Sequence, residues 1–132
     1  MTNQEAAAIL LEGEKAFGLI HTLHTVFGKG IKVKVPFTKA ACNTDIEDLL
    51  FSVRSHNALK RSGLFTVGQV IDALNDESLL KIRNLGVKSA MEIQTKILQH
   101  GYDQLTDSEK KTFFIDIINK NGYAEKIQNM KY

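Results

Sequence analysis

From residue 52 onward, apolar residues recur at intervals of three and four positions, and polar residues that favour helix ends separate the groups. This spacing is typical of amphipathic helices. Ser52 can cap a first helix, capping boxes begin at Thr66 and Thr106, and Asn75 can cap a short helix between them. We therefore predict helices at about residues 53–62, 67–74, 76–82, 88–100 and 107–121.

The N-terminal third has two different patterns. A capping box at Thr2 predicts a helix that ends near Gly13, and further apolar residues up to Phe27 fall at helical spacing. Farther along, three β-branched residues alternate with Lys32 and Lys34, which is typical of a strand. The predicted fold class is mainly α: a compact bundle of short helices, with a small N-terminal segment that contains a strand or hairpin.

Composition limits the classes of protein that fit. The protein has 132 residues and one cysteine, Cys42, which excludes an internal disulfide and a zinc site built from several thiolates. No basic leader and no apolar run of membrane-spanning length is present, so we expect a cytoplasmic protein without a membrane partner. Association with the nucleoid is compatible with this location. Residues 52–101 carry seven lysines and arginines against four acidic residues, an excess that suits contact with phosphates.

The stretch RNLGVKSAMEI, residues 83–93, places a glycine-centred turn between two predicted helices, as in a helix-hairpin-helix. Gly86 lets a phosphate approach the backbone, and the amides of residues 87–90 begin a helix whose dipole favours anions. Lys88 adds a charge and Ser89 a hydroxyl donor, while Leu85 anchors the turn in the core. The alternative is a turn that only connects the two helices, in which Gly86 supplies a positive φ and Ser89 caps the next helix.

Together with VRSHNALKRSG at residues 53–63, this turn resembles the C-terminal domain of the bacterial RNA polymerase α subunit over residues 46–98. The resemblance implies a five-helix domain that binds A/T-rich DNA in the minor groove and docks against activators and sigma factor. We expect Glu92 to orient Arg54 or Lys88 rather than to touch a phosphate, and the alternative is a structural glutamate on the helix surface. The family's DNA-contacting positions fall on Arg54, Asn57, Gly86, Lys88, Ser89 and Glu92.

The sequence departs from the family at several positions. Val87 replaces a usual lysine, Leu50 replaces an acidic residue beside the sigma-facing Glu47 and Asp48, and His56 replaces a small residue. Residues 1–43 do not resemble the assembly domain of the α subunit. We therefore expect a stand-alone small protein with an N-terminal segment of unknown role at 1–43, the α-like helical domain at 44–102, and a C-terminal helical extension at 103–132.

The predicted function is non-enzymatic binding of double-stranded, A/T-rich DNA in transcription or its regulation, without a cofactor. The alternative is a protein-interaction module that binds RNA polymerase or a transcription regulator, which exposed Phe113 and Phe114 would favour. An enzyme that flips a base has candidate aspartates at 103, 107 and 116, but 132 residues leave no room for a second lobe. His21 and His24 have the spacing of metal ligands without a third ligand nearby, so no metal site is predicted.

Overall fold

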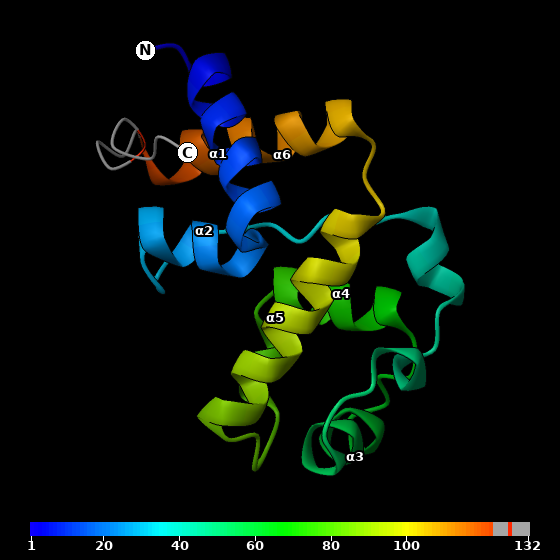
Figure 1. Ribbon diagram of the computed structural model, residues 1–132. Helices are drawn as coiled ribbons and strands as arrows, with labels where there is room; N and C mark the ends of the chain where they lie inside the picture. Colours follow the sequence, from blue (N-terminus) through cyan, green and yellow to red (C-terminus); the bar gives the residue numbers. More distant parts are fainter. Residues whose placement is uncertain (123–126, 128–132) are drawn as a thin grey trace. The chain divides into compact units, whose positions relative to one another are not determined.

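The computed structural model describes residues 1–122 and 127, and within this part of the protein the fold is helical (Figure 1). Helices of three residues per turn are labelled η. In sequence order the elements are α1 (Asn3–Phe17), α2 (Leu19–Phe27), η1 (Lys39–Asn43), η2 (Ile46–Leu49), α3 (Val53–Arg61), α4 (Val67–Asn75), η3 (Ser78–Lys81), α5 (Val87–Asp103) and α6 (Asp107–Asn121).

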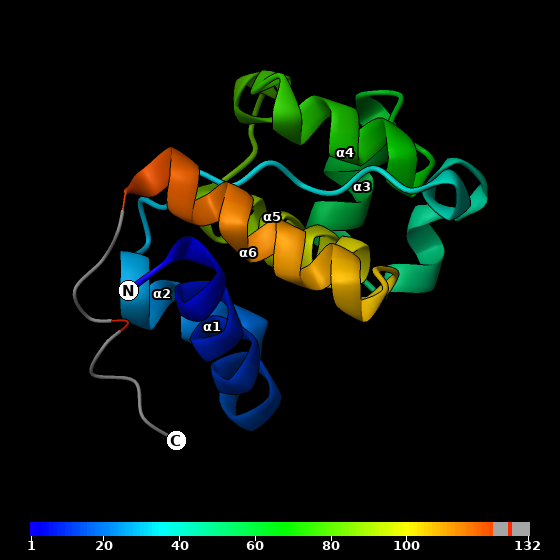
Figure 2. The same ribbon diagram turned by 90° about the horizontal axis from the view of Figure 1, so that it is seen from above.

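The protein divides into two compact units. The first contains residues 1–33 and 105–132, and the second contains residues 34–104. Most of the N-terminal segment and the C-terminal extension, which the sequence separates from the helical core, thus belong to one unit. Figures 1 and 2 show the elements of each unit from two directions.

In the first unit, α1 packs against both α2 and α6. Capping boxes begin α1 at Thr2 and α6 at Thr106, as predicted: each threonine hydroxyl accepts a hydrogen bond from the amide of the glutamate three residues later, and the carboxylate of that glutamate accepts one from the threonine amide. The glycine that ends α1 is Gly18, with φ of 90°, so this helix is one turn longer than the prediction of an end near Gly13. Phe113 and Phe114 of α6 are both buried.

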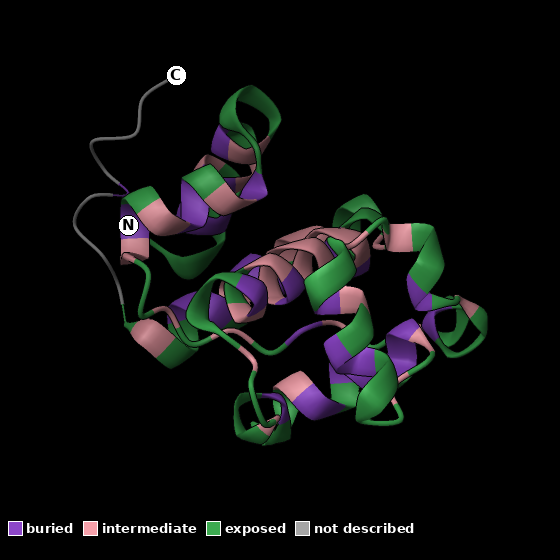
Figure 3. Ribbon diagram, turned by 90° about the horizontal axis from the view of Figure 1, so that it is seen from below, coloured by how far each residue is buried: buried purple, intermediate pink, exposed green. Residues whose placement is uncertain are grey.

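The second unit surrounds one apolar core, formed by Val35 and by residues from η1 to α5 (Figure 3). Ser52 caps α3 and a capping box at Thr66 begins α4, both as predicted. Asn75 does not cap the next helix: it is the last residue of α4, and η3 begins after Glu77 without a side-chain cap. Gly101 does not end α5 but lies inside it, where an added Cβ would be 3.1 Å from the carbonyl oxygen of Pro36.

The strand predicted around residues 31–35 is absent, and the described residues contain no sheet, only an isolated bridge between Asp45 and Thr66. The segment lacks a strand to pair with because the preceding residues form α2. Side-chain amides supply the hydrogen bonds instead: Asn121 bonds the amide and carbonyl of Lys32, and Asn75 bonds those of Val35. These contacts satisfy the backbone of an extended segment without a ladder.

Candidate nucleic-acid interface

The turn between η3 and α5 obtains its shape from Asn84, not from Gly86. Asn84 has a φ of 64°, whereas Gly86 has φ of −70° and ψ of 161°, which any residue can adopt. An added Cβ on Gly86 would meet no atom within 4 Å. Neither backbone conformation nor packing therefore requires glycine at position 86, and the alternative in which Gly86 only supplies a positive φ is wrong.

The N-terminus of α5 is open to an anion. Gly86 is its N-cap residue, and this helix has no side-chain cap. The first hydrogen bond of α5 runs from the amide of Ala90 to the carbonyl of Gly86 at 2.9 Å. The amides of residues 87–89 precede that bond and have no acceptor within the helix, so three amides rather than the predicted four can bind a phosphate.

The side chains around this turn differ in their exposure. Lys88 is exposed and Val87 is 86% exposed, while Leu85 packs against the core as predicted. Ser89 is buried, with 7% of its surface exposed. The amide of Ser89 therefore suits phosphate binding better than its hydroxyl does, which the sequence alone did not indicate.

Arg54 and Asn57 lie on α3, three positions apart and so on one face of the helix. Both side chains are exposed, and neither forms a hydrogen bond or ion pair with another described residue. The Arg54 guanidinium is thus free to bind an external partner.

Glu92 connects α5 to the beginning of α3. Its carboxylate accepts hydrogen bonds from the amide of Ser52 at 3.0 Å, from the hydroxyl of Ser52 at 2.8 Å and from the hydroxyl of Ser55. Lys96 lies 3.8 Å from the same carboxylate. The partners of Glu92 are therefore these three residues rather than Arg54 or Lys88, and its carboxylate holds the N-terminus of α3 beside α5.

The pKa of Glu92 reflects two opposing effects. Partial burial raises the pKa, but the hydrogen bonds from Ser55 and Ser52, together with the charge of Lys96, outweigh burial and lower it below its ordinary value of 4.5. At neutral pH the residue is therefore a carboxylate that accepts hydrogen bonds.

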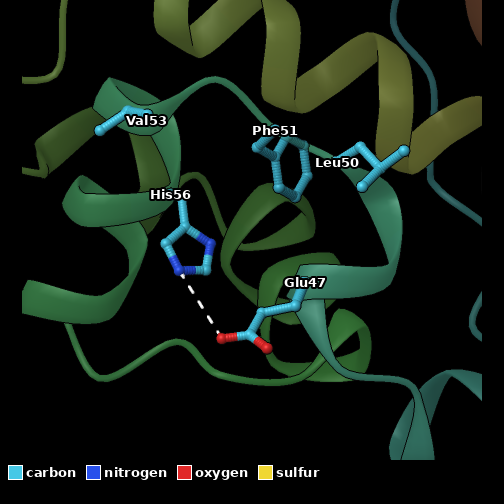
Figure 4. Close-up of a pocket in the computed structure, with 5 residues that line it drawn as sticks. All are labelled: Glu47, Leu50, Phe51, Val53 and His56. Carbon is cyan, nitrogen blue, oxygen red and sulfur yellow. Dashed lines mark ion pairs between the residues drawn. The ribbon is translucent and has the colours of Figure 1, made fainter.

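A shallow hollow of about 290 Å³ lies beside the start of α3, lined by Glu47, Leu50, Phe51, Val53 and His56 (Figure 4). Leu50 is 81% exposed and Val53 is 77% exposed. The imidazole Nε2 of His56 lies 3.9 Å from a carboxylate oxygen of Glu47, so His56 faces this hollow. Phe51 and Val53 were not among the residues predicted from the sequence, although apolar residues on both sides of the helix cap Ser52 were a visible signal.

Neither a metal cluster nor a membrane span is found in the described part of the protein. Within residues 1–122 and 127, no three histidine, cysteine or acidic side chains gather closely enough to hold a metal ion. No helix in the same residues has the length and apolar character needed to cross a bilayer.

These features define a class of protein: a small, all-helical domain in which the N-terminus of one helix has no side-chain cap. Comparison with known families is more specific. The family that comprises the C-terminal domain of the bacterial RNA polymerase alpha subunit matches residues 35–99, nearly the whole second unit. This match covers 65 of the 132 residues, and the matched family is that of a non-catalytic DNA-binding domain.

Curated relatives agree. The protein is 51% identical over 57 residues to the DNA-directed RNA polymerase subunit alpha of Rubrobacter xylanophilus, covering 43% of its own length and 18% of the relative. It is 43% identical over 89 residues to the same subunit of Acidothermus cellulolyticus, covering 64% of its own length and 26% of the relative. The protein thus spans about a quarter or less of these relatives. No solved structure matches it significantly.

Proposed function

We propose that this protein is a non-enzymatic DNA-binding protein that acts in transcription or its regulation. It contacts the minor groove and phosphate backbone of double-stranded DNA through the turn before α5 and the exposed face of α3. The observation that carries this proposal is the N-terminus of α5. The fold does not require a glycine at Gly86, and the amides of residues 87–89 have no side-chain cap.

Each residue has a defined role in this proposal. The amides that follow Gly86 bind one phosphate, and the Lys88 ammonium adds an attraction that does not depend on sequence. Arg54 enters the minor groove, where A/T-rich DNA is narrow and its negative potential is strong. Asn57 lies on the same face of α3 and hydrogen-bonds a base edge or the backbone.

The direct test is replacement of Arg54 with alanine. Arg54 is exposed and forms no hydrogen bond or ion pair with another described residue, so Arg54→Ala should leave helicity and thermal stability unchanged and weaken binding to an A/T-rich duplex about tenfold or more. Fluorescence anisotropy at several salt concentrations measures this, with a G/C-rich duplex for comparison. Arg61→Ala, which removes an exposed arginine from the last turn of the same helix, is the matched control. Equal effects of the two variants would contradict the assigned role of Arg54.

A second function rests on the hollow beside α3. Its apolar rim of Leu50 and Val53 is too exposed to stabilise the core, which supports contact with a protein such as RNA polymerase or a transcription regulator. Phe113 and Phe114 do not support that function, because both are buried. If Val53→Asp abolished binding to purified RNA polymerase and left DNA binding intact, the interaction function would be supported; unchanged polymerase binding would contradict it.

A further inference from the structure

Two charged side chains of α5 hold the segment of residues 49–55, which leads into α3. Lys96 donates a hydrogen bond to the carbonyl of Leu50 at 2.6 Å and a longer one to the carbonyl of Leu49 at 3.4 Å. Its ammonium also lies 5.6 Å from the centre of the Phe51 ring, within the range of a cation–π contact. One lysine thus contacts three consecutive residues of the segment.

Glu92 lies one turn earlier on α5 and contacts the next part of the same segment. Its carboxylate accepts from Ser52 and from Ser55, whose side chain is fully buried. The charges match the groups that they contact, since an ammonium donates to carbonyl oxygens and a carboxylate accepts from an amide and hydroxyls. We call Glu92 and Lys96, with Ser52 and Ser55, the α5 clamp.

The α5 clamp fixes the two helices on which the proposed DNA site lies. Ser52 is the N-cap of α3, and Arg54 follows it by two residues. Glu92 and Lys96 belong to the helix whose N-terminus provides the phosphate-binding amides. The orientation of Arg54 relative to those amides therefore depends on hydrogen bonds made by side chains that need not touch DNA themselves.

We propose that Lys96, Ser52 and Ser55 act with Glu92 as positioning residues for DNA binding: they hold α3 so that Arg54 and the α5 amides engage the same stretch of backbone. This inference rests on the proposed DNA-binding function. In this inference Glu92 contributes to DNA binding by holding α3 in place and not by touching DNA. Lys96 likewise contributes by holding the segment before α3 and not by neutralising a phosphate.

A double-mutant cycle with Arg54 separates positioning from direct contact, because a residue that acts by placing Arg54 loses that effect once Arg54 is removed. In the full-length protein, Glu92→Gln and Lys96→Met should each weaken binding to an A/T-rich duplex about tenfold. In an Arg54→Ala background the same changes should weaken it less than about twofold. Lys96→Arg, which keeps donors for the carbonyls, should retain most of the affinity.

The salt dependence of binding provides a second measurement. Removing a lysine that neutralises a phosphate reduces the slope of log K against log salt by about 0.9. Removing a positioning lysine in the Arg54→Ala background should instead leave that slope unchanged. Lys60→Met is the control, because it removes an exposed lysine that pairs with Glu47 and lies outside the α5 clamp. It should show no coupling to Arg54.

Ser55→Ala provides a smaller change if Glu92→Gln fails to fold, since it deletes one hydroxyl and no charge. Coupling to Arg54 in this variant supports the inference, and equal losses in both backgrounds overturn it. Wild-type protein that does not bind DNA would overturn the proposed function, whereas wild-type binding with variants uncoupled from Arg54 would overturn only the positioning role.

Discussion

Replacing Gly86 with aspartate should stabilise the protein and weaken its binding to DNA. Glycine normally marks a position that the fold requires, but here φ is −70° and an added Cβ meets no atom within 4 Å. Gly86→Asp therefore introduces no strain. Its carboxylate can also cap the free amides at the start of α5.

The gain in stability can be worked from three contributions. Losing a glycine reduces the entropy of the unfolded state, worth about 0.4–1 kcal/mol at a compatible position. Aspartate exceeds glycine as an N-cap by a few tenths of a kcal/mol, and its charge at the positive end of the helix dipole adds about 0.3–1 kcal/mol. The lower ends of these ranges add to a net gain of about 1 kcal/mol, or a melting temperature higher by roughly 3–6 °C.

The expected loss of DNA binding has the same origin. The carboxylate occupies the amides that would bind a phosphate and repels that phosphate, so affinity should fall about tenfold or more and the salt slope should decrease by about one. Circular dichroism melting and fluorescence anisotropy measure the two effects. Asn43→Asp, which adds the same charge at an exposed position of η1, is the control.

Two results would refute this reasoning independently. Unchanged DNA affinity in Gly86→Asp would show that the α5 N-terminus is not the phosphate site. A lower melting temperature would show that the fold does require glycine there. Gly86→Ala separates the contributions further, because it keeps the entropic gain, loses the preferred cap and should change stability little.

Three further predictions concern other residues. Val87→Lys should increase DNA affinity and steepen the salt slope by about 0.9, because the side chain is 86% exposed and adds a charge beside the phosphate site. Asn75→Ala should cost about 1–3 kcal/mol in denaturant unfolding, since the amide and carbonyl of Val35 both lose their side-chain partner. Glu92→Gln should reduce stability at neutral pH, and this difference should shrink as pH falls below about 4.5, because a lowered pKa stabilises the fold only while the carboxylate is ionised. A pH series of thermal melts measures it; a difference independent of pH would contradict the assigned hydrogen bonds.

The sequence alone located most of the helix starts. Thr2, Ser52, Thr66 and Thr106 all cap helices as predicted, because each cap forms between residues three positions apart and needs no tertiary contact. The resemblance of residues 46–98 to the family was also readable, since two motifs in the right order carry it, and the family match covers residues 35–99. The contact positions assigned to DNA remain a prediction.

Tertiary structure decided the rest, because the contacts concerned join residues far apart in the sequence. Asn75 reads locally as a helix cap but bonds Val35, forty positions away, and thereby replaces the strand pairing that the alternating pattern predicted. Glu92 likewise reads as a surface residue near the turn, and only the packing of α3 on α5 brings Ser52 and Ser55 to its carboxylate. Hydrogen bonds between residues close in sequence can be predicted from the sequence itself. The partner of a polar side chain that bonds a distant residue depends instead on how the apolar core brings the helices together.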